Sequence, residues 1–175
     1  METPLDHPVW HALTGRHAPF AVACGQARHY IREIAPFSGI AEPSATAYAD
    51  LAVDLAPRTE ARLFSARDYP PPAGWETISA RPIVQMTFAR PNVAGSEEFD
   101  ARIGVLGLPD VPDMLALVDA AKPGPFGART VELGTYVGVR DNRTSRLIAM
   151  GGERFRVAGY VELKPLARAT RPRSA

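Results

Sequence analysis

The sequence has a single cysteine, Cys24, among its 175 residues. One thiol cannot form a disulfide within the chain, and scarce cysteine is typical of proteins from a reducing compartment. No apolar run approaches the roughly 18 residues that a membrane-spanning helix needs. The first residues, Met1–Asp6, have neither the basic start nor the apolar stretch of a secretory signal. We therefore expect a cytoplasmic protein without a membrane segment.

Basic side chains are scarce outside one end of the chain, and the formal net charge is only +1. Four of the twenty basic residues lie in the last twelve residues, where no acidic residue occurs. The remaining chain has sixteen basic and nineteen acidic residues, a net charge of −3. A mildly acidic body does not offer the positive surface that nucleic-acid binding requires. We expect neither a nucleic acid nor a membrane as a partner.

Patterns typical of metal and dinucleotide sites are also missing. His7 and His11 are four residues apart, but no carboxylate or cysteine stands at a suitable spacing to complete a ligand set. The stretch Gly104–Gly107 lacks the third glycine of a dinucleotide-binding fingerprint. Cys24 has no local signature of a catalytic nucleophile, and we expect a small buried residue there. The sequence therefore predicts no metal.

The first half of the chain contains short helix and strand signals. A helix is predicted over residues 7–14, and a second over residues 44–55, where Ser44 can cap the N-terminus. Strands are predicted over Phe20–Cys24, Glu60–Phe64 and Ile83–Phe88, the last because apolar and polar residues alternate.

The second half shows a clearer order of elements. A strand over Ile103–Leu108 precedes a helix that Asp110 caps and Lys122 ends. Two strands over Tyr136–Val139 and Leu147–Met150 form an antiparallel hairpin. The second of them continues past a bulge at Gly151-Gly152, and a third strand begins at Gly159.

Together these elements predict a mixed α+β fold in two parts. The polar stretch 91–98 marks the boundary between an N-terminal part, residues 1–97, and a second part, residues 98–163. Residues 164–175 have no periodicity, and Pro165 removes a backbone donor that a central strand needs. We expect residues 164–175 to form a disordered basic tail.

Two stretches, Lys122–Val139 and Arg146–Leu163, resemble the acetyl-CoA-dependent N-acetyltransferases of the GNAT superfamily. The resemblance implies a mostly antiparallel sheet with flanking helices, in which the third of these strands splays from a neighbour and acetyl-CoA inserts beside it. It further implies acetyl-CoA as cosubstrate and direct transfer of an acetyl group to a primary amine, a small molecule or a peptide. Residues 1–97 would then be a degenerate GNAT-like half.

In the superfamily the third strand runs into a glycine-rich loop that holds the pyrophosphate, and no such loop follows Leu163 here. We therefore expect a chain that is truncated or frame-shifted after Leu163 and has negligible acetyltransferase activity. The residues that bind the cosubstrate stay unknown, because the phosphate loop is absent from the sequence.

The resemblance also implies roles for four residues. Glu162 occupies the place of a carboxylate that acts as general base and takes a proton from the substrate ammonium. Phe126, Glu132 and Tyr136 lie in the variable segment that binds the acceptor. These four residues are the candidate site.

Structural roles remain open for the same residues. Glu162 can instead face solvent or pair with Arg154 or Arg156, Phe126 can anchor the core, and Glu132 can be exposed. The chain is then a non-catalytic ligand-binding or interaction module. In either case an unpaired apolar sheet edge invites self-association.

Overall fold

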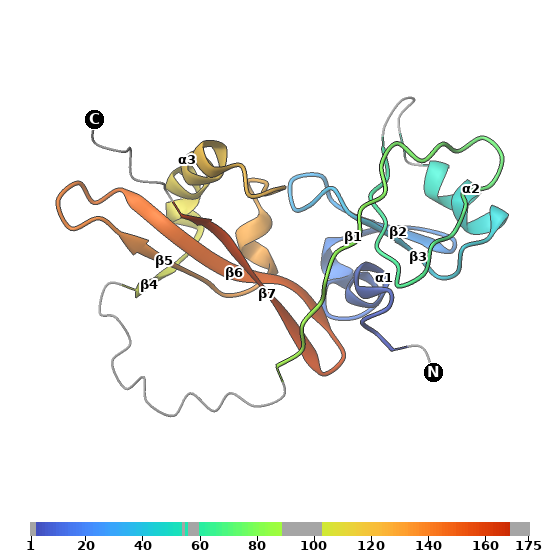
Figure 1. Ribbon diagram of the computed structural model, residues 1–175, viewed down its shortest axis with the longest axis horizontal. Coiled ribbons are helices and arrows are strands. Elements are labelled where there is room, and N and C mark those ends of the chain that lie inside the picture. Colours follow the sequence, from blue (N-terminus) through green and yellow to red (C-terminus); the bar gives the residue numbers. More distant parts are fainter. Residues whose placement is uncertain (1–2, 54, 56–59, 89–102, 169–175) are drawn as a thin grey trace.

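The computed structural model describes residues 3–53, 55, 60–88 and 103–168. They form two halves that lie side by side along the longest axis of the molecule (Figure 1). The first half contains a three-stranded sheet and the second a four-stranded sheet. Every strand pair in both sheets is antiparallel. The mixed α+β class predicted from the sequence is confirmed.

The first half places two short helices against a small sheet. Its α2 begins where the sequence predicts, because the Ser44 Oγ accepts a hydrogen bond from the Ala47 amide at 3.1 Å. Tyr48 and Leu51 of α2 are buried against the sheet. The elements are α1 (Pro8–Leu13), the 3₁₀ helix η1 (Ala18–Phe20), β1 (Ala21–Cys24), β2 (Ala27–Tyr30), β3 (Ser38–Ile40) and α2 (Ala45–Val53).

The second half is one sheet in the order β4-β5-β6-β7 with a helix, α3, packed against β6 and β7. Met114 and Leu117 anchor α3 in the core, and Lys122 ends it in the left-handed conformation with a φ of 49°. The elements are β4 (Ile103–Leu106), η2 (Leu108–Asp110), α3 (Val111–Ala121), η3 (Thr130–Leu133), β5 (Tyr136–Arg140), β6 (Leu147–Val157) and β7 (Tyr160–Arg168).

Two strands predicted in the first half are wrong. Glu60–Phe64 makes only an isolated bridge, between Phe37 and Arg62, and Ile83–Phe88 belongs to no strand. Val84 and Met86 are 88% and 91% exposed. Alternation shows that one face of a segment could be buried, but a strand also needs a neighbour with free backbone groups. In the described residues, the sheet of the first half consists of β1, β2 and β3, and neither predicted segment is one of its strands.

Three predictions in the second half need correction. The first strand ends at Leu106, and Asp110 does not cap α3 through its side chain. The Asp110 carboxylate accepts hydrogen bonds from the Gly107 amide at 2.9 Å and from Arg140 at 2.6 Å. The strand β7 runs on to Arg168, so residues 164–168 are not part of a disordered tail.

Pro165 is compatible with β7 because this strand is the last of the sheet in the described part of the chain. The predicted bulge is confirmed, since the pairing of β6 with β7 shifts between Met150 and Gly151. Residues 169–175 and the boundary expected at 91–98 lie outside the described residues.

Strand β6 contributes its C-terminal residues to the core of the first half. Its C-terminal residues Phe155 and Val157 are 1% and 6% exposed and pack against α1 and the segment that follows β2. The Phe155 ring lies 5.7 Å from that of Phe37 and 6.0 Å from that of Phe64, between ring centroids. Aromatic contacts with β6 therefore help to fix the first half to the sheet.

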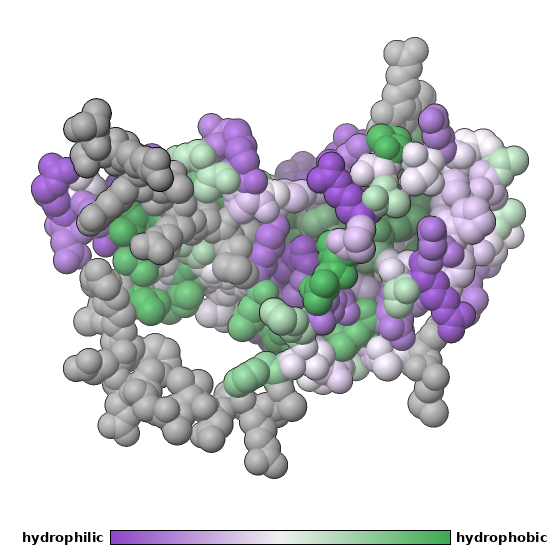
Figure 2. All heavy atoms as spheres, viewed as in Figure 1, coloured by the Kyte–Doolittle hydropathy of each residue, from purple (hydrophilic) through white to green (hydrophobic). Residues whose placement is uncertain are grey.

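Apolar side chains also remain at the surface. Figure 2 shows them in green on both halves and in the region where the halves meet. Val105 of β4, Val137 of β5 and Leu163 of β7 are 78%, 37% and 72% exposed. Exposed apolar surface on a sheet is typical of an association surface, and self-association stays a prediction. No helix in the described ranges is long and apolar enough to cross a membrane.

We predict that Phe155→Ala lowers the free energy of unfolding by about 3–5 kcal/mol, because it empties the aromatic centre of the shared core. Val53→Ala, at a side chain of α2 that is 68% exposed, should change it by less than about 0.5 kcal/mol. Urea unfolding followed by tryptophan fluorescence measures both. Equal midpoints for the two variants would mean that Phe155 does not hold the halves together.

Candidate functional site

The hairpin of β6 and β7 brings Glu162 to Arg154. The register places Glu162 opposite Phe155, and the Glu162 carboxylate accepts a hydrogen bond from the Arg154 Nη2 and forms an ion pair with it. The two side chains are 29% and 23% exposed. Arg156, the other partner considered from the sequence, binds the Glu153 carboxylate instead, at 2.5 and 2.9 Å. Glu162 is thus a partly exposed carboxylate held by one arginine.

The Arg154 guanidinium is itself held by aromatic rings. Its central carbon lies 4.9 Å from the Phe155 ring centroid, 5.6 Å from that of Phe64 and 5.9 Å from that of Phe37. These distances fit cation–π contacts, which attract the charge to the ring faces. Through Arg154, these contacts fix the position of the candidate base Glu162 relative to the aromatic core of the first half.

Tyr136 lies deep in the sheet. It is 2% exposed, and its hydroxyl donates a hydrogen bond to the Glu153 carbonyl oxygen at 2.8 Å. Burial is the main cause that raises the pKa of this phenol well above its ordinary value. The structure therefore places the Tyr136 hydroxyl in a backbone contact between neighbouring strands.

Phe126 and Glu132 belong to the segment that connects α3 to β5. The Phe126 ring packs edge-on against Tyr136, with 5.8 Å between ring centroids, and also borders an open hollow of about 460 Å³ beside Leu115 and Val118 of α3. Glu132 forms a bidentate ion pair with Arg129, at 2.7 and 2.8 Å, which lowers the pKa of its carboxyl. Of these two residues, Phe126 lines the hollow and Glu132 does not.

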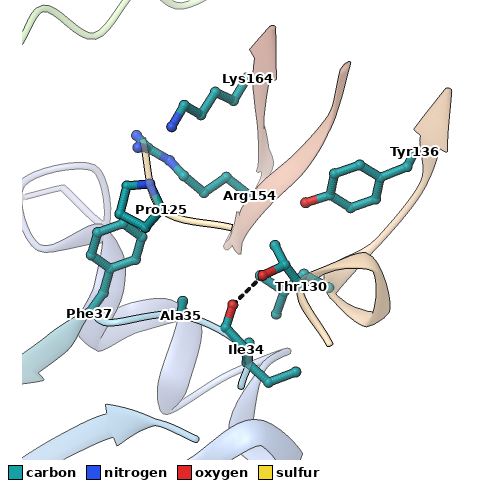
Figure 3. Close-up of a pocket in the computed structure, with 9 residues that line it drawn as sticks. Ile34, Ala35, Phe37, Pro125, Thr130, Tyr136, Arg154 and Lys164 are labelled. Carbon is teal, nitrogen blue, oxygen red and sulfur yellow. Dashed lines mark hydrogen bonds between the residues drawn. The ribbon is translucent and has the colours of Figure 1, made fainter. Parts of the chain in front are cut away.

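A small cavity with a volume of about 20 Å³ lies where the first half, the segment between α3 and β5, and the four-stranded sheet meet. Figure 3 shows side chains from all three parts around it: Phe37 from the first half, Pro125 and Thr130 from the connecting segment, and Tyr136, Arg154 and Lys164 from the sheet. The Thr130 hydroxyl donates to the Ile34 carbonyl. The cavity is therefore built from residues far apart in the sequence.

Two residues of this cavity were not recognised as site residues from the sequence. The sequence predicts Arg154 only as a partner for Glu162, and it predicts Lys164 as part of the disordered tail. One signal was available: Lys164 is one of only two lysines in a chain with eighteen arginines. A lysine that stands two residues after Glu162 on a strand shares its face of the sheet.

In the part of the chain that the structure describes, no group of three or more histidine, cysteine, aspartate or glutamate side chains could hold a metal ion.

Comparison with solved structures identifies a similar protein. No protein-family model matches the sequence, and no curated protein matches it. A solved structure from Novosphingobium aromaticivorans DSM 12444, assigned to the GNAT family of acetyltransferases, is 30% identical and superimposes with a TM-score of 0.74. The likeness covers 95% of this chain and 72% of that one. This chain belongs to the GNAT family.

In GNAT terms, β4 to β7 and α3 are the sheet and helix that the resemblance predicted. β7 pairs with β6 along its whole length, with two shifts in register. Its outer edge has no strand partner among the described residues. The GNAT membership thus points to the β7 edge, with Glu162 on it, as the region to test.

We predict that Tyr136→Phe lowers the free energy of unfolding by about 1 kcal/mol, because it removes the hydrogen bond to the Glu153 carbonyl and leaves the ring in place. Tyr160→Phe is the matched control, since Tyr160 is 46% exposed. It should change stability by less than about 0.5 kcal/mol. Urea unfolding measures both, and a Tyr136→Phe protein as stable as the control would refute the structural role.

Proposed function

We propose that this chain has the sheet of an N-acetyltransferase that uses acetyl-CoA to acetylate a primary amine. The observation that carries the proposal is the placement of Glu162, a partly exposed carboxylate on a GNAT sheet strand whose outer edge has no strand partner in the described residues. Exposed backbone donors and acceptors on such an edge can pair with an extended, amide-containing molecule. Such a molecule includes the pantetheine arm of acetyl-CoA, so the edge fits the cosubstrate.

Glu162 has the chemistry that the acceptor requires. An amine attacks a thioester only in its neutral form, so a proton must leave the ammonium before or during transfer. The Glu162 carboxylate takes that proton, while Arg154 keeps the carboxylate in position through their ion pair. The amine nitrogen then bonds to the acetyl carbon, the bond between carbon and sulfur breaks, and the thiolate leaves. A backbone amide of β7 stabilises the charge on the carbonyl oxygen.

The acceptor lies against Phe126, because that ring borders the open hollow beside α3. Glu132 and Tyr136 act on the acceptor indirectly: their bonds to Arg129 and to the Glu153 carbonyl fix the segment that carries Phe126. That the isolated chain has negligible turnover stays a prediction. Release of free thiol from acetyl-CoA at a robust rate would contradict it.

The experiment is a calorimetric titration of the purified chain with acetyl-CoA, compared with Glu162→Gln. We expect saturable heat from both proteins, because Glu162 acts on the amine. Any acetylation of a panel of primary amines, followed with labelled acetyl-CoA, should fall by roughly 10²- to 10⁴-fold in the variant. Glu60→Gln, which changes an exposed carboxylate bound to Arg62 in the first half, is the matched control and should retain most of that transfer.

Two outcomes would overturn the proposal. Absence of heat with acetyl-CoA would favour a non-catalytic binding module. Measurable acetylation that is equal in Glu162→Gln and the unchanged chain would remove Glu162 from the reaction.

A further inference from the structure

Two positively charged side chains meet at the cavity between the halves without a full set of partners. The Lys164 side chain is partly buried, and its ammonium makes no hydrogen bond or ion pair with another described residue. The Arg154 Nε is buried and has no hydrogen-bond partner in the described part of the chain. A buried cationic donor without an acceptor is costly, because it gives up its hydration without compensation.

The other polar groups around the cavity do not supply the missing acceptor. The Tyr136 hydroxyl already donates to the Glu153 carbonyl, and the Thr130 hydroxyl donates to the Ile34 carbonyl. Glu162 binds the Arg154 Nη2 rather than the Nε. The described lining therefore presents more donors than acceptors.

The charges around the cavity are also unbalanced. Arg154 and Lys164 carry two positive charges against the single carboxylate of Glu162, because Glu153 is paired with Arg156. Burial and the nearby Arg154 lower the pKa of Lys164, while Glu162 opposes this shift. Lys164 thus lies in a site where one more negative charge would be stabilising.

The connecting segment leaves space for the lysine. Gly124 has a φ of 122°, and a Cβ placed on it would lie 2.9 Å from the Lys164 Nζ. The volume of about 20 Å³ is enough for one or two water-sized groups. That space suits a carboxylate or another small oxyanion group, and it is too small for a large ligand to enter whole. Figure 3 shows the Lys164 ammonium and the Arg154 guanidinium close together above Pro125.

We propose that Arg154 and Lys164 form a binding site for a small oxyanion, the carboxylate of a free acid or of a larger ligand. The anion accepts hydrogen bonds from the Lys164 ammonium and the Arg154 Nε and balances their charge. The site does not depend on acetyl transfer, so this proposal is independent of the proposed function.

The test uses the fact that the chain has only two lysines, Lys122 and Lys164. The unchanged protein is acylated with a limiting amount of an amine-reactive ester at mildly alkaline pH, and mass spectrometry gives the modification of each lysine. The reaction is repeated in acetate, in phosphate and in chloride at one ionic strength. Lys122 is the internal control, because its side chain is 74% exposed and pairs with Asp119.

We expect acetate to slow the modification of Lys164 and to leave Lys122 unchanged. An anion that raises the pKa of Lys164 by about one unit lowers its neutral, reactive fraction roughly tenfold. Protection by acetate and not by phosphate identifies a carboxylate site, whereas protection by both identifies a general oxyanion site. Equal rates in all three salts would overturn the proposal and indicate that water alone fills the cavity. Equal protection of both lysines would overturn it as well.

Thermal unfolding provides an independent readout. Acetate should raise the melting temperature of the unchanged protein and of Lys122→Met above the value in chloride, and this difference should be lost in Lys164→Met. An acetate effect that persists in a folded Lys164→Met protein would also refute the site. If Lys164→Met does not fold, the labelling of the unchanged protein decides alone.

Discussion

The structure depends on the length of β6, which takes part in two different cores. Its first residues pair with β5 and pack beneath α3, and its last residues carry Phe155 and Val157 into the N-terminal half. A flat, regular strand cannot direct side chains into both cores, so the strand must twist and change its register between them. The Gly151-Gly152 pair, where the register with β7 changes, provides that shift. A Cβ at position 152 would lie 2.2 Å from the Tyr136 ring, so glycine is required there.

The change of core along β6 also explains where the charged groups lie. Arg154 stands between the residues that face each core, and three aromatic rings hold its guanidinium at the junction. From there it reaches Glu162 on β7, and Lys164 follows two residues later on the same strand. The positions of the candidate base, of the arginine that holds it and of the cavity thus all depend on the change of core along β6. Altering the junction should disturb all three together.

The sequence predicted the second half well because its signals are local. Hydrophobic periodicity in α3, the ending at Lys122 and the hairpin that follows all depend on residues close together in the chain. The first half was harder, since β2 has no β-branched residue and β3 is three residues long with Gly39 at its centre. That glycine is explained only by the tertiary structure, because a Cβ would lie 2.6 Å from the Trp10 backbone nitrogen of α1.

The candidate site was predicted only in part for a related reason. The GNAT resemblance points to Glu162 by its position in the sequence, and the sequence offers Arg154 and Arg156 as its possible ion-pair partners. The register of the hairpin brings Glu162 to Arg154. Lys164 could not be assigned while β7 was expected to stop at Leu163. The cavity brings together β7, the segment after β2 and the segment before β5, so no pattern local to one stretch could reveal it.

The positive charge of the cavity also depends on tertiary contacts. Glu153, one residue from Arg154, pairs with Arg156 instead. Glu162 is therefore the one carboxylate that the structure pairs with Arg154 in the described residues. The pairing of Glu153 with Arg156 therefore leaves the cavity with an excess of positive charge.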